Sequence, residues 1–266
     1  MTTRKSDMTF TLDRRQVLAA AAAGSVASAT AVHAKTSAAG PRKTNNVVLV
    51  HGAFADGSSW SEVAARLLAK GYNVSAVQNP LTSLADDVAA TKRVLSRQQG
   101  AVVLVGHSWG GAVISEAGAV ANVSALVYVS ALAPDAGEAV MDLQSHGPAS
   151  PGMQGAKPDN GLLWFDPAAY RDALAADLPV RRTRVLAAVQ QPIAPSCFGE
   201  KLSAAAWHDK PSWYLLSEND KALSPELQRW MAARIKAKIK AVPSSHLSLI
   251  SRAEDVVELI DQAANA

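Results

Sequence analysis

GHSWGG, residues 106–111, places Ser108 at the centre of a Gly-x-Ser-x-Gly pattern. Residues 101–105 before it read AVVLV, an apolar and mostly β-branched run that is typical of a buried strand. Residues 112–121 after it are mostly small and apolar and indicate a helix. A glycine-flanked serine between a strand and a helix is the pattern of a sharp turn that exposes the hydroxyl. Ser108 is therefore the predicted nucleophile.

Two backbone amides are predicted to face the group that Ser108 attacks. Trp109 stands at the start of the predicted helix, where N–H groups are unpaired and the helix dipole favours a negative charge. The second amide is expected in the loop after the early strand at residues 47–50. The N–H of Ala53 is the predicted donor there, and that of Phe54 is the second choice. Together these amides would form an oxyanion hole.

A nucleophilic serine needs a general base, which in this strand–turn–helix context follows the serine in the chain. His246 comes after KIKAV, the strand pattern at residues 238–242, and before residues 247–260, which are predicted to form an amphipathic helix. It is the predicted base. The other histidines lie in the N-terminal segment, at a strand end, within the serine turn or in irregular stretches, and they are His33, His51, His107, His146 and His208.

The acid that orients the base is expected between the serine and the histidine, again after a strand. SWYLLS at residues 212–217 is such a strand pattern, and Asp220 follows it. Asp220 is predicted to accept the Nδ1 proton of His246 and to fix its tautomer. Two alternatives stay open: Glu218 in the same loop, and Asp135 after an earlier strand pattern.

The rest of the chain agrees with one compact α/β domain. It has 266 residues, of which 48% are hydrophobic, enough for a large core. Strand and helix patterns alternate through residues 45–134, which predicts a mostly parallel, doubly wound sheet with helices on both faces. Residues 211–266 complete this core. Residues 135–210 break the rhythm and are interpreted as an inserted cap, with a Pro- and Gly-rich entry loop at 146–161.

Aromatic side chains in the cap are candidates for substrate contact. Trp164, Phe165 and Trp207, together with Phe54 of the oxyanion loop, are predicted to line an apolar pocket, with the cap's own small core as the alternative. Neither His51 nor His107 has a second ligand at metal spacing, so no metal site is predicted. The single cysteine excludes an intrachain disulfide. The net charge is +3, but no nucleic-acid-binding motif accompanies it, so no nucleic-acid partner is predicted.

The residues HGAFADGSSW (51–60), GHSWGG (106–111), SENDKALSPELQRW (217–230) and PSSHLSLIS (243–251) resemble the α/β-hydrolase superfamily. The resemblance is greatest to the branch of plant hydroxynitrile lyases, plant methylesterases and bacterial pyrethroid-hydrolase-like carboxylesterases, and it covers residues 45–263. It implies the α/β-hydrolase fold and a triad of Ser108, Asp220 and His246, with oxyanion amides from Ala53 and Trp109. It also implies a small-molecule ester as substrate and no cofactor.

Three functions remain as hypotheses from this resemblance: an ester hydrolase, a carbon–carbon lyase of the hydroxynitrile-lyase type, and a slow-turnover ligand receptor. The lyases carry a lysine directly after the catalytic histidine and a threonine beside the oxyanion loop. This chain has Leu247 and Gly52 at the corresponding places. Those two departures favour hydrolysis of carboxylic esters. Acyl and alcohol preference and oligomeric state are left open by the sequence.

The N-terminus predicts a targeting segment. Arg14 and Arg15 precede an alanine-rich apolar run that ends in small residues suited to signal peptidase. Residues 1–34 therefore resemble a twin-arginine export signal, followed by a linker at 35–44, which predicts a periplasmic or secreted enzyme. The alternative is an uncleaved tail on a cytoplasmic enzyme. The apolar run is too interrupted by Gly and Ser to predict a stable membrane span.

Overall fold

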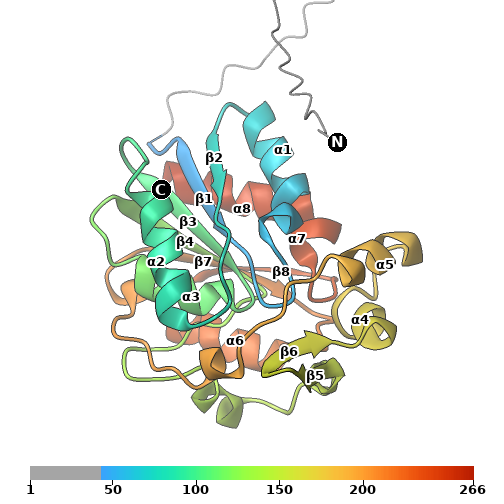
Figure 1. The fold of residues 1–266 in the computed structure, drawn as a ribbon. Coiled ribbons are helices and arrows are strands. Elements are labelled where there is room, and N and C mark those ends of the chain that lie inside the picture. The colour runs from blue at the N-terminus through green and yellow to red at the C-terminus, as the bar shows by residue number, and fades with distance from the viewer. Residues whose placement is uncertain (1–42) are drawn as a thin grey trace, which may run out of the picture. The chain divides into compact units, whose positions relative to one another are not determined.

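The structure of this chain is a computed structural model, and it describes residues 43–266 (Figure 1). The predicted export signal at 1–34 and most of the predicted linker lie outside the described residues. Within residues 43–266, no helix is long and apolar enough to cross a bilayer.

A six-stranded parallel sheet forms the centre of the fold, which confirms the predicted α/β class. β1 pairs with β2 on one side and with β3 on the other, so the chain reverses its direction of travel across the sheet at β1. Ligands of open α/β sheets bind outside the carboxyl ends of the strands at such a reversal. In spatial order the strands are β2 (Asn73–Ala76), β1 (Asn46–Val50), β3 (Val102–His107), β4 (Val123–Val129), β7 (Ser212–Ser217) and β8 (Lys238–Val242).

Helices cover both faces of the sheet, as right-handed crossovers between parallel strands require. α1 (Ser61–Ala69) contacts α8 (Ala253–Asn265), which also contacts β3, β4 and β7. α2 (Leu84–Leu95) contacts α3 (Gly110–Ala117), and both contact β1. Every residue of β1, β3 and β7 is buried because each of these strands is covered on both faces.

Local sequence explains where the helices begin. Ser83 caps α2 by accepting a hydrogen bond from the Asp86 amide at 3.0 Å. Ser224 caps α6 (Pro225–Arg234), where proline occupies the first turn. The single helix predicted for residues 247–260 is wrong, because the chain forms the short helix α7 (Ser248–Ser251) and then α8. The backbone leaves helical geometry at Arg252, with φ −125°.

The segment between β4 and β7 forms its own small elements. β5 (Ala156–Asp159) and β6 (Leu162–Phe165) are an antiparallel pair joined by Asn160 and Gly161, both at positive φ. An Asn-Gly turn of this kind matches the twist of a two-residue hairpin. Part of the predicted entry loop is therefore a hairpin. The other elements are η2 (Asp142–His146), η3 (Pro151–Gly155), α4 (Pro167–Leu174), α5 (Val180–Ala188), η4 (Pro195–Phe198) and η5 (Ala206–His208), and η1 (Gly57–Trp60) precedes α1 in the core.

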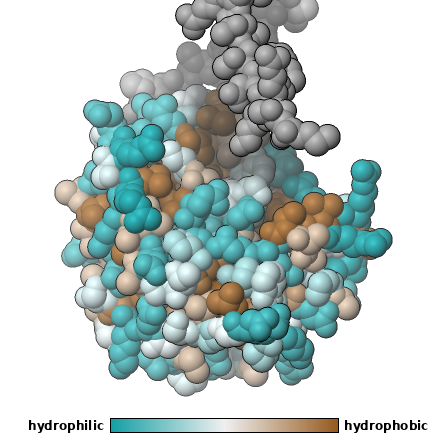
Figure 2. All heavy atoms as spheres, viewed as in Figure 1, coloured by the Kyte–Doolittle hydropathy of each residue, from teal (hydrophilic) through white to brown (hydrophobic). Residues whose placement is uncertain are grey.

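The surface in Figure 2 is mainly hydrophilic, with separate apolar patches. Large apolar side chains that are exposed include Val180 and Val185 of α5. Single apolar residues on a surface are ordinary in soluble proteins.

Candidate active site

Ser108 lies at the tip of a strained turn between β3 and α3. Its φ of +51° is left-handed, a conformation that costs energy for any residue with a Cβ and is held by its surroundings. A Cβ added at Gly106 would come within 2.5 Å of the Gly110 carbonyl oxygen, and one at Gly110 within 2.5 Å of the Val50 oxygen. Because glycine has no Cβ, these two positions allow β3, α3 and β1 to pack closely together.

The loop after β1 lies directly against this turn. A Cβ at Gly52 would be 2.8 Å from the Cβ of Ser108. Phe54 has a φ of +57°, the second strained residue at the site. Within residues 43–266, the amides of Ala53, Phe54 and Trp109 donate no hydrogen bond, so their N–H groups remain available to a ligand. The structure thus places the predicted donors beside Ser108 and leaves them unpaired.

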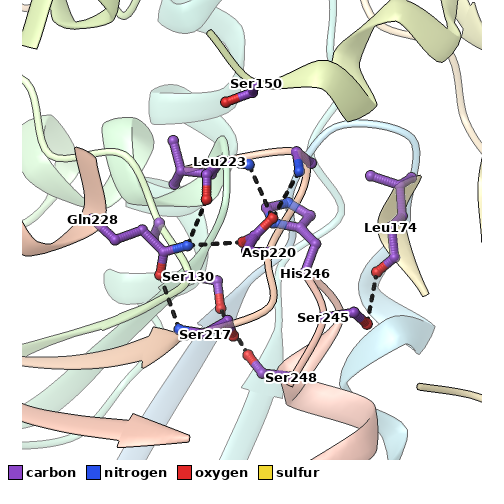
Figure 3. A network of polar contacts seen from close by, with 12 residues as sticks. Ser130, Ser150, Leu174, Ser217, Asp220, Leu223, Gln228, Ser245, His246 and Ser248 are labelled. Atoms are coloured by element: carbon purple, nitrogen blue, oxygen red, sulfur yellow. Dashed lines mark hydrogen bonds and ion pairs between the residues drawn. The ribbon is translucent and has the colours of Figure 1, made fainter. Parts of the chain in front are cut away.

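Asp220 and His246 form a buried pair at the carboxyl ends of β7 and β8 (Figure 3). The Nδ1 atom of His246 lies 2.7 Å from Oδ2 of Asp220. Oδ2 also accepts from Nε2 of Gln228 at 2.9 Å, and Oδ1 accepts from the amides of Ala222 and Leu223 at 2.8 and 2.9 Å. Four donors saturate an ionised carboxylate. His246 therefore carries its proton on Nδ1, and the lone pair of Nε2 is left free.

Neither alternative for the acid bonds to His246. Asp135 bonds to Nε2 of His208 at 2.7 Å and to the guanidinium of Arg234 at 3.2 Å. Glu218 is exposed and makes no side-chain hydrogen bond within residues 43–266. Of the three carboxylates that the sequence offered, only Asp220 contacts His246.

His107 ties the serine turn to the loop of His246. Its Nε2 donates to the carbonyl oxygen of His246 at 3.0 Å, and the two rings lie 4.8 Å apart. Burial, with a smaller contribution from neighbouring His246, holds the pKa of His107 well below 6.5. His107 is therefore a neutral spacer. The sequence analysis does not predict this contact of His107 with the His246 loop. The only sequence feature that points to it is the position of His107 directly before Ser108.

A buried cluster of three serine hydroxyls joins the loops beneath the pair (Figure 3). Ser130 lies 2.7 Å from Ser217 and 2.8 Å from Ser248, measured between Oγ atoms. Because Ser217 stands three residues before Asp220 and Ser248 two after His246, the cluster fixes the spacing of the two loops.

Asp87 of α2 holds the residue that follows the nucleophile. Its Oδ2 accepts from Nε1 of Trp109 at 2.7 Å, and its Oδ1 accepts from the amide of Leu81 at 2.8 Å. The residue is fully buried. Burial raises the pKa of Asp87 from 3.8 to about 6, because the hydrogen bond from Trp109 only partly offsets desolvation. The sequence feature that could indicate this role is the position of Asp87, a charged residue on the apolar face of the helix predicted there.

We expect this carboxyl to make stability depend on pH. Because the pKa of Asp87 is higher when folded than when unfolded, its favourable contribution is full below about pH 4 and is lost as the pH rises to about 6. The difference amounts to at most about 3 kcal/mol. The unfolding free energy of Asp87→Asn relative to wild type should therefore rise between pH 4 and 7, as measured by urea titration.

Asp86→Asn is the matched control for this prediction. Asp86 is the exposed neighbour, and the hydroxyl of Thr82 holds the pKa of its carboxyl below 3.8. Removing that charge cannot produce the same trend. Parallel pH curves for Asp87→Asn and wild type would contradict the assignment of the raised pKa to Asp87.

The predicted substrate contacts are only partly brought together. Phe54 packs edge-on against Phe165, with ring centroids 5.3 Å apart, and lines a crevice with Tyr170 and Leu247. Trp207 points elsewhere, because its Nε1 donates to the Pro134 carbonyl oxygen at 3.0 Å. Trp164 is partly exposed on β6 and does not line this crevice.

A larger depression lies between the segment that follows β4 and the loop after β7. It has a volume of about 440 Å³, and its lining includes Pro151, Lys157, Asp166 and Lys221. None of the four predicted substrate contacts lines it.

Within residues 43–266, no cluster of three potential metal ligands occurs.

A parallel sheet with a strained serine at the end of β3 and a His–Asp pair after β8 and β7 defines a hydrolase architecture. The chain belongs to the alpha/beta hydrolase family, whose model matches residues 47–259. Among curated relatives, alpha/beta hydrolase nvfD of Aspergillus novofumigatus is 26% identical over 246 residues, covering 82% of this chain and 96% of the relative.

Solved structures of the expected branch share the fold. A pyrethroid hydrolase from Sphingobium faniae superposes with a TM-score of 0.71 at 22% identity, covering 84% of this chain and 98% of that one. Polyneuridine aldehyde esterase gives a TM-score of 0.72 at 20% identity, covering 83% and 99%. The predicted resemblance to this branch is confirmed.

Proposed function

We propose that this protein is a serine hydrolase that cleaves carboxylic esters through an acyl-enzyme intermediate. The observation that supports this most is the contact between Nδ1 of His246 and the carboxylate of Asp220. The Nδ1 proton of His246 is committed to Asp220 at 2.7 Å, so Nε2 is available as a base. The strained turn of Ser108 and the unpaired amides beside it supply the other parts that acyl transfer needs.

In the first half of the reaction, Nε2 of His246 takes the proton of Ser108 while Oγ attacks the ester carbonyl carbon. The carbonyl oxygen becomes an oxyanion, and the N–H groups of Ala53 and Trp109 stabilise it. Asp220 remains ionised and stabilises the imidazolium. The tetrahedral intermediate then collapses, the carbon–oxygen bond to the alcohol breaks, and His246 protonates the leaving alkoxide.

In the second half, water replaces the alcohol. His246 removes a proton from the water as its oxygen attacks the acyl carbon, and the same two amides hold the second oxyanion. Collapse breaks the bond between Ser108 Oγ and the acyl carbon. The serine recovers its proton from His246, and the carboxylic acid leaves.

A panel of aryl esters with increasing acyl size tests the proposal and reads out the size preference. Release of the phenol by purified protein, lost in Ser108→Ala, is the expected result. Tight binding of several esters with negligible turnover of all of them would instead favour the receptor hypothesis.

We also propose that the enzyme is exported, because paired arginines precede an alanine-rich run. The expected mature N-terminus is close to Lys35. Mass spectrometry of the protein from its native host, after cell fractionation, measures this directly. A soluble cytoplasmic protein that begins at Met1 or Thr2 would reject the proposal.

A further inference from the structure

The loop that carries His246 is bound by a carboxylate from outside the central sheet. Asp177 lies between α4 and α5, in the segment that separates β4 from β7. Its Oδ2 accepts from Oγ of Ser244 at 3.1 Å and from the amide of Ser245 at 3.2 Å. Its Oδ1 accepts a short hydrogen bond from Oγ of Ser245. All three bonds reach the two residues directly before His246.

The same turn binds the residue after the histidine. The carbonyl oxygen of Leu174 accepts from the amide of Leu247 at 3.0 Å. It also lies 3.2 Å from Oγ of Ser245 (Figure 3). The hydroxyl has one proton, and the charged carboxylate of Asp177 is the stronger acceptor. Residues 174–177 therefore bracket His246 on both sides.

Asp177 has no ion-pair partner within residues 43–266. Partial burial would raise the pKa of its carboxyl, but hydrogen bonds from Ser245, Ser251 and Ser244 outweigh that effect and hold the pKa below 3.8. The carboxylate is therefore charged near neutral pH. Because hydrogen bonds from the loop of Ser244 and Ser245 stabilise this charge, removing the carboxylate should loosen that loop more than it affects other contacts.

Other anchors of the His246 loop come from the α/β core. Asp220 holds the imidazole at Nδ1, and His107 holds the carbonyl oxygen. Neither fixes the backbone before the histidine. The core also holds part of that backbone, because the Asn219 amide donates to the Ser244 carbonyl oxygen at 3.0 Å. The Ser245 amide donates to Asp177 instead, so the segment between β4 and β7 reaches the base through this carboxylate.

We propose that Asp177 is a positioning residue that fixes the loop of His246, so that Nε2 is held in place to deprotonate Ser108. The inference rests on the proposed serine hydrolase function and deepens it. It makes the correct docking of residues 174–177 a condition for turnover.

Asp177→Ala tests this through the reactivity of Ser108 with a fluorophosphonate. In that reaction Oγ bonds to phosphorus, fluoride leaves, and His246 takes the proton, so the rate reports the base without needing an ester substrate. Misplacing a catalytic group by about 1 Å can cost about 10²-fold. We expect labelling and kcat to fall by about 10- to 100-fold, while KM changes by less than about three-fold.

Two further variants separate positioning from general damage to the fold. Asp177→Glu keeps the charge and should recover part of the labelling rate. In a double-mutant cycle, Asp177→Ala with Ser245→Ala should be no slower than Asp177→Ala alone, because the Ser245 hydroxyl acts through its hydrogen bond to Asp177. Ser245→Ala, which keeps the amide donor, also tests the contact if Asp177→Ala fails to fold.

Asp159→Asn is the matched control. Asp159 is an exposed carboxylate of β5 in the same segment and makes no side-chain hydrogen bond within residues 43–266. It should label at the wild-type rate. Wild-type labelling in folded Asp177→Ala, or a loss confined to KM, would overturn the proposal. A wild-type protein that labels but hydrolyses no ester would remove only the ester assignment, whereas a wild type that does not label would reject both.

Discussion

Replacing Ser108 or His246 by alanine is expected to lower ester turnover by about 10⁵- to 10⁶-fold each. Without Oγ no acyl-enzyme forms, and without Nε2 the hydroxyl keeps its proton. Because the two groups act in one proton transfer, the double variant should be scarcely slower than either single one. Initial rates on an aryl ester, with protein freed of contaminating esterases, measure the effect. Near-normal turnover in Ser108→Ala would reject the mechanism.

The acid should show a smaller loss. Asp220→Asn is expected to lower turnover by about 10⁴-fold, because an amide can present its NH₂ to Nδ1 and stabilise the wrong tautomer. Asp135→Asn is the control, since that carboxylate pairs with His208 and Arg234 instead. Retained activity in Asp220→Asn together with lost activity in Asp135→Asn would assign the acid role to Asp135. The assignment of Ser108 as nucleophile would be unaffected.

Local patterns suffice for the parts of the site that stand at strand ends. The strand predicted at residues 212–217 is β7, and the one at 238–242 is β8, so the positions of Asp220 and His246 follow from short runs of sequence. Parallel strands then bring their carboxyl ends to one edge. The glycines around Ser108 are predictable for the same reason, because the turn they permit is local.

Contacts between distant segments are what the sequence could not provide. Asp87 reaches Trp109, and Asp177 reaches Ser245, across separate elements whose docking no periodicity encodes. Asp135 remained a candidate acid because its partner Arg234 is 99 residues away. The break at Arg252 is not predictable from the apolar pattern, because that pattern continues through it. The Asn160-Gly161 turn, by contrast, is a local hairpin signal that could have been read.

The sharpest functional contrast is between ester hydrolysis and cleavage of a cyanohydrin. A lyase must stabilise the cyanide that leaves, and the branch that does so places a lysine after the catalytic histidine. Here that residue is Leu247, which is buried and lines a crevice with Phe54 and Tyr170. Among residues 43–266, no Lys or Arg lines the crevice, and the one charged side chain that does, Asp56, is negative.

The second feature of the lyases, a threonine beside the oxyanion loop, does not fit sterically at the position of Gly52. A Cβ at Gly52 would already lie 2.8 Å from Ser108 Cβ, so a threonine there would force the oxyanion loop away from the nucleophile. An anion that develops away from water without a cation beside it costs several kcal/mol, or several powers of ten in rate. Ester hydrolysis needs neither the lysine nor the threonine, since its leaving alkoxide takes a proton from His246.

We therefore expect clear turnover of short aryl esters and cleavage of mandelonitrile that is slower by at least about 10³-fold under the same conditions. Phenol release and benzaldehyde formation by one preparation of purified protein give the two rates, and Ser108→Ala gives the background for each. Mandelonitrile cleavage that rivals ester turnover and disappears in Ser108→Ala would overturn the assignment. It would mean that this site stabilises cyanide without the cation at the position of Leu247.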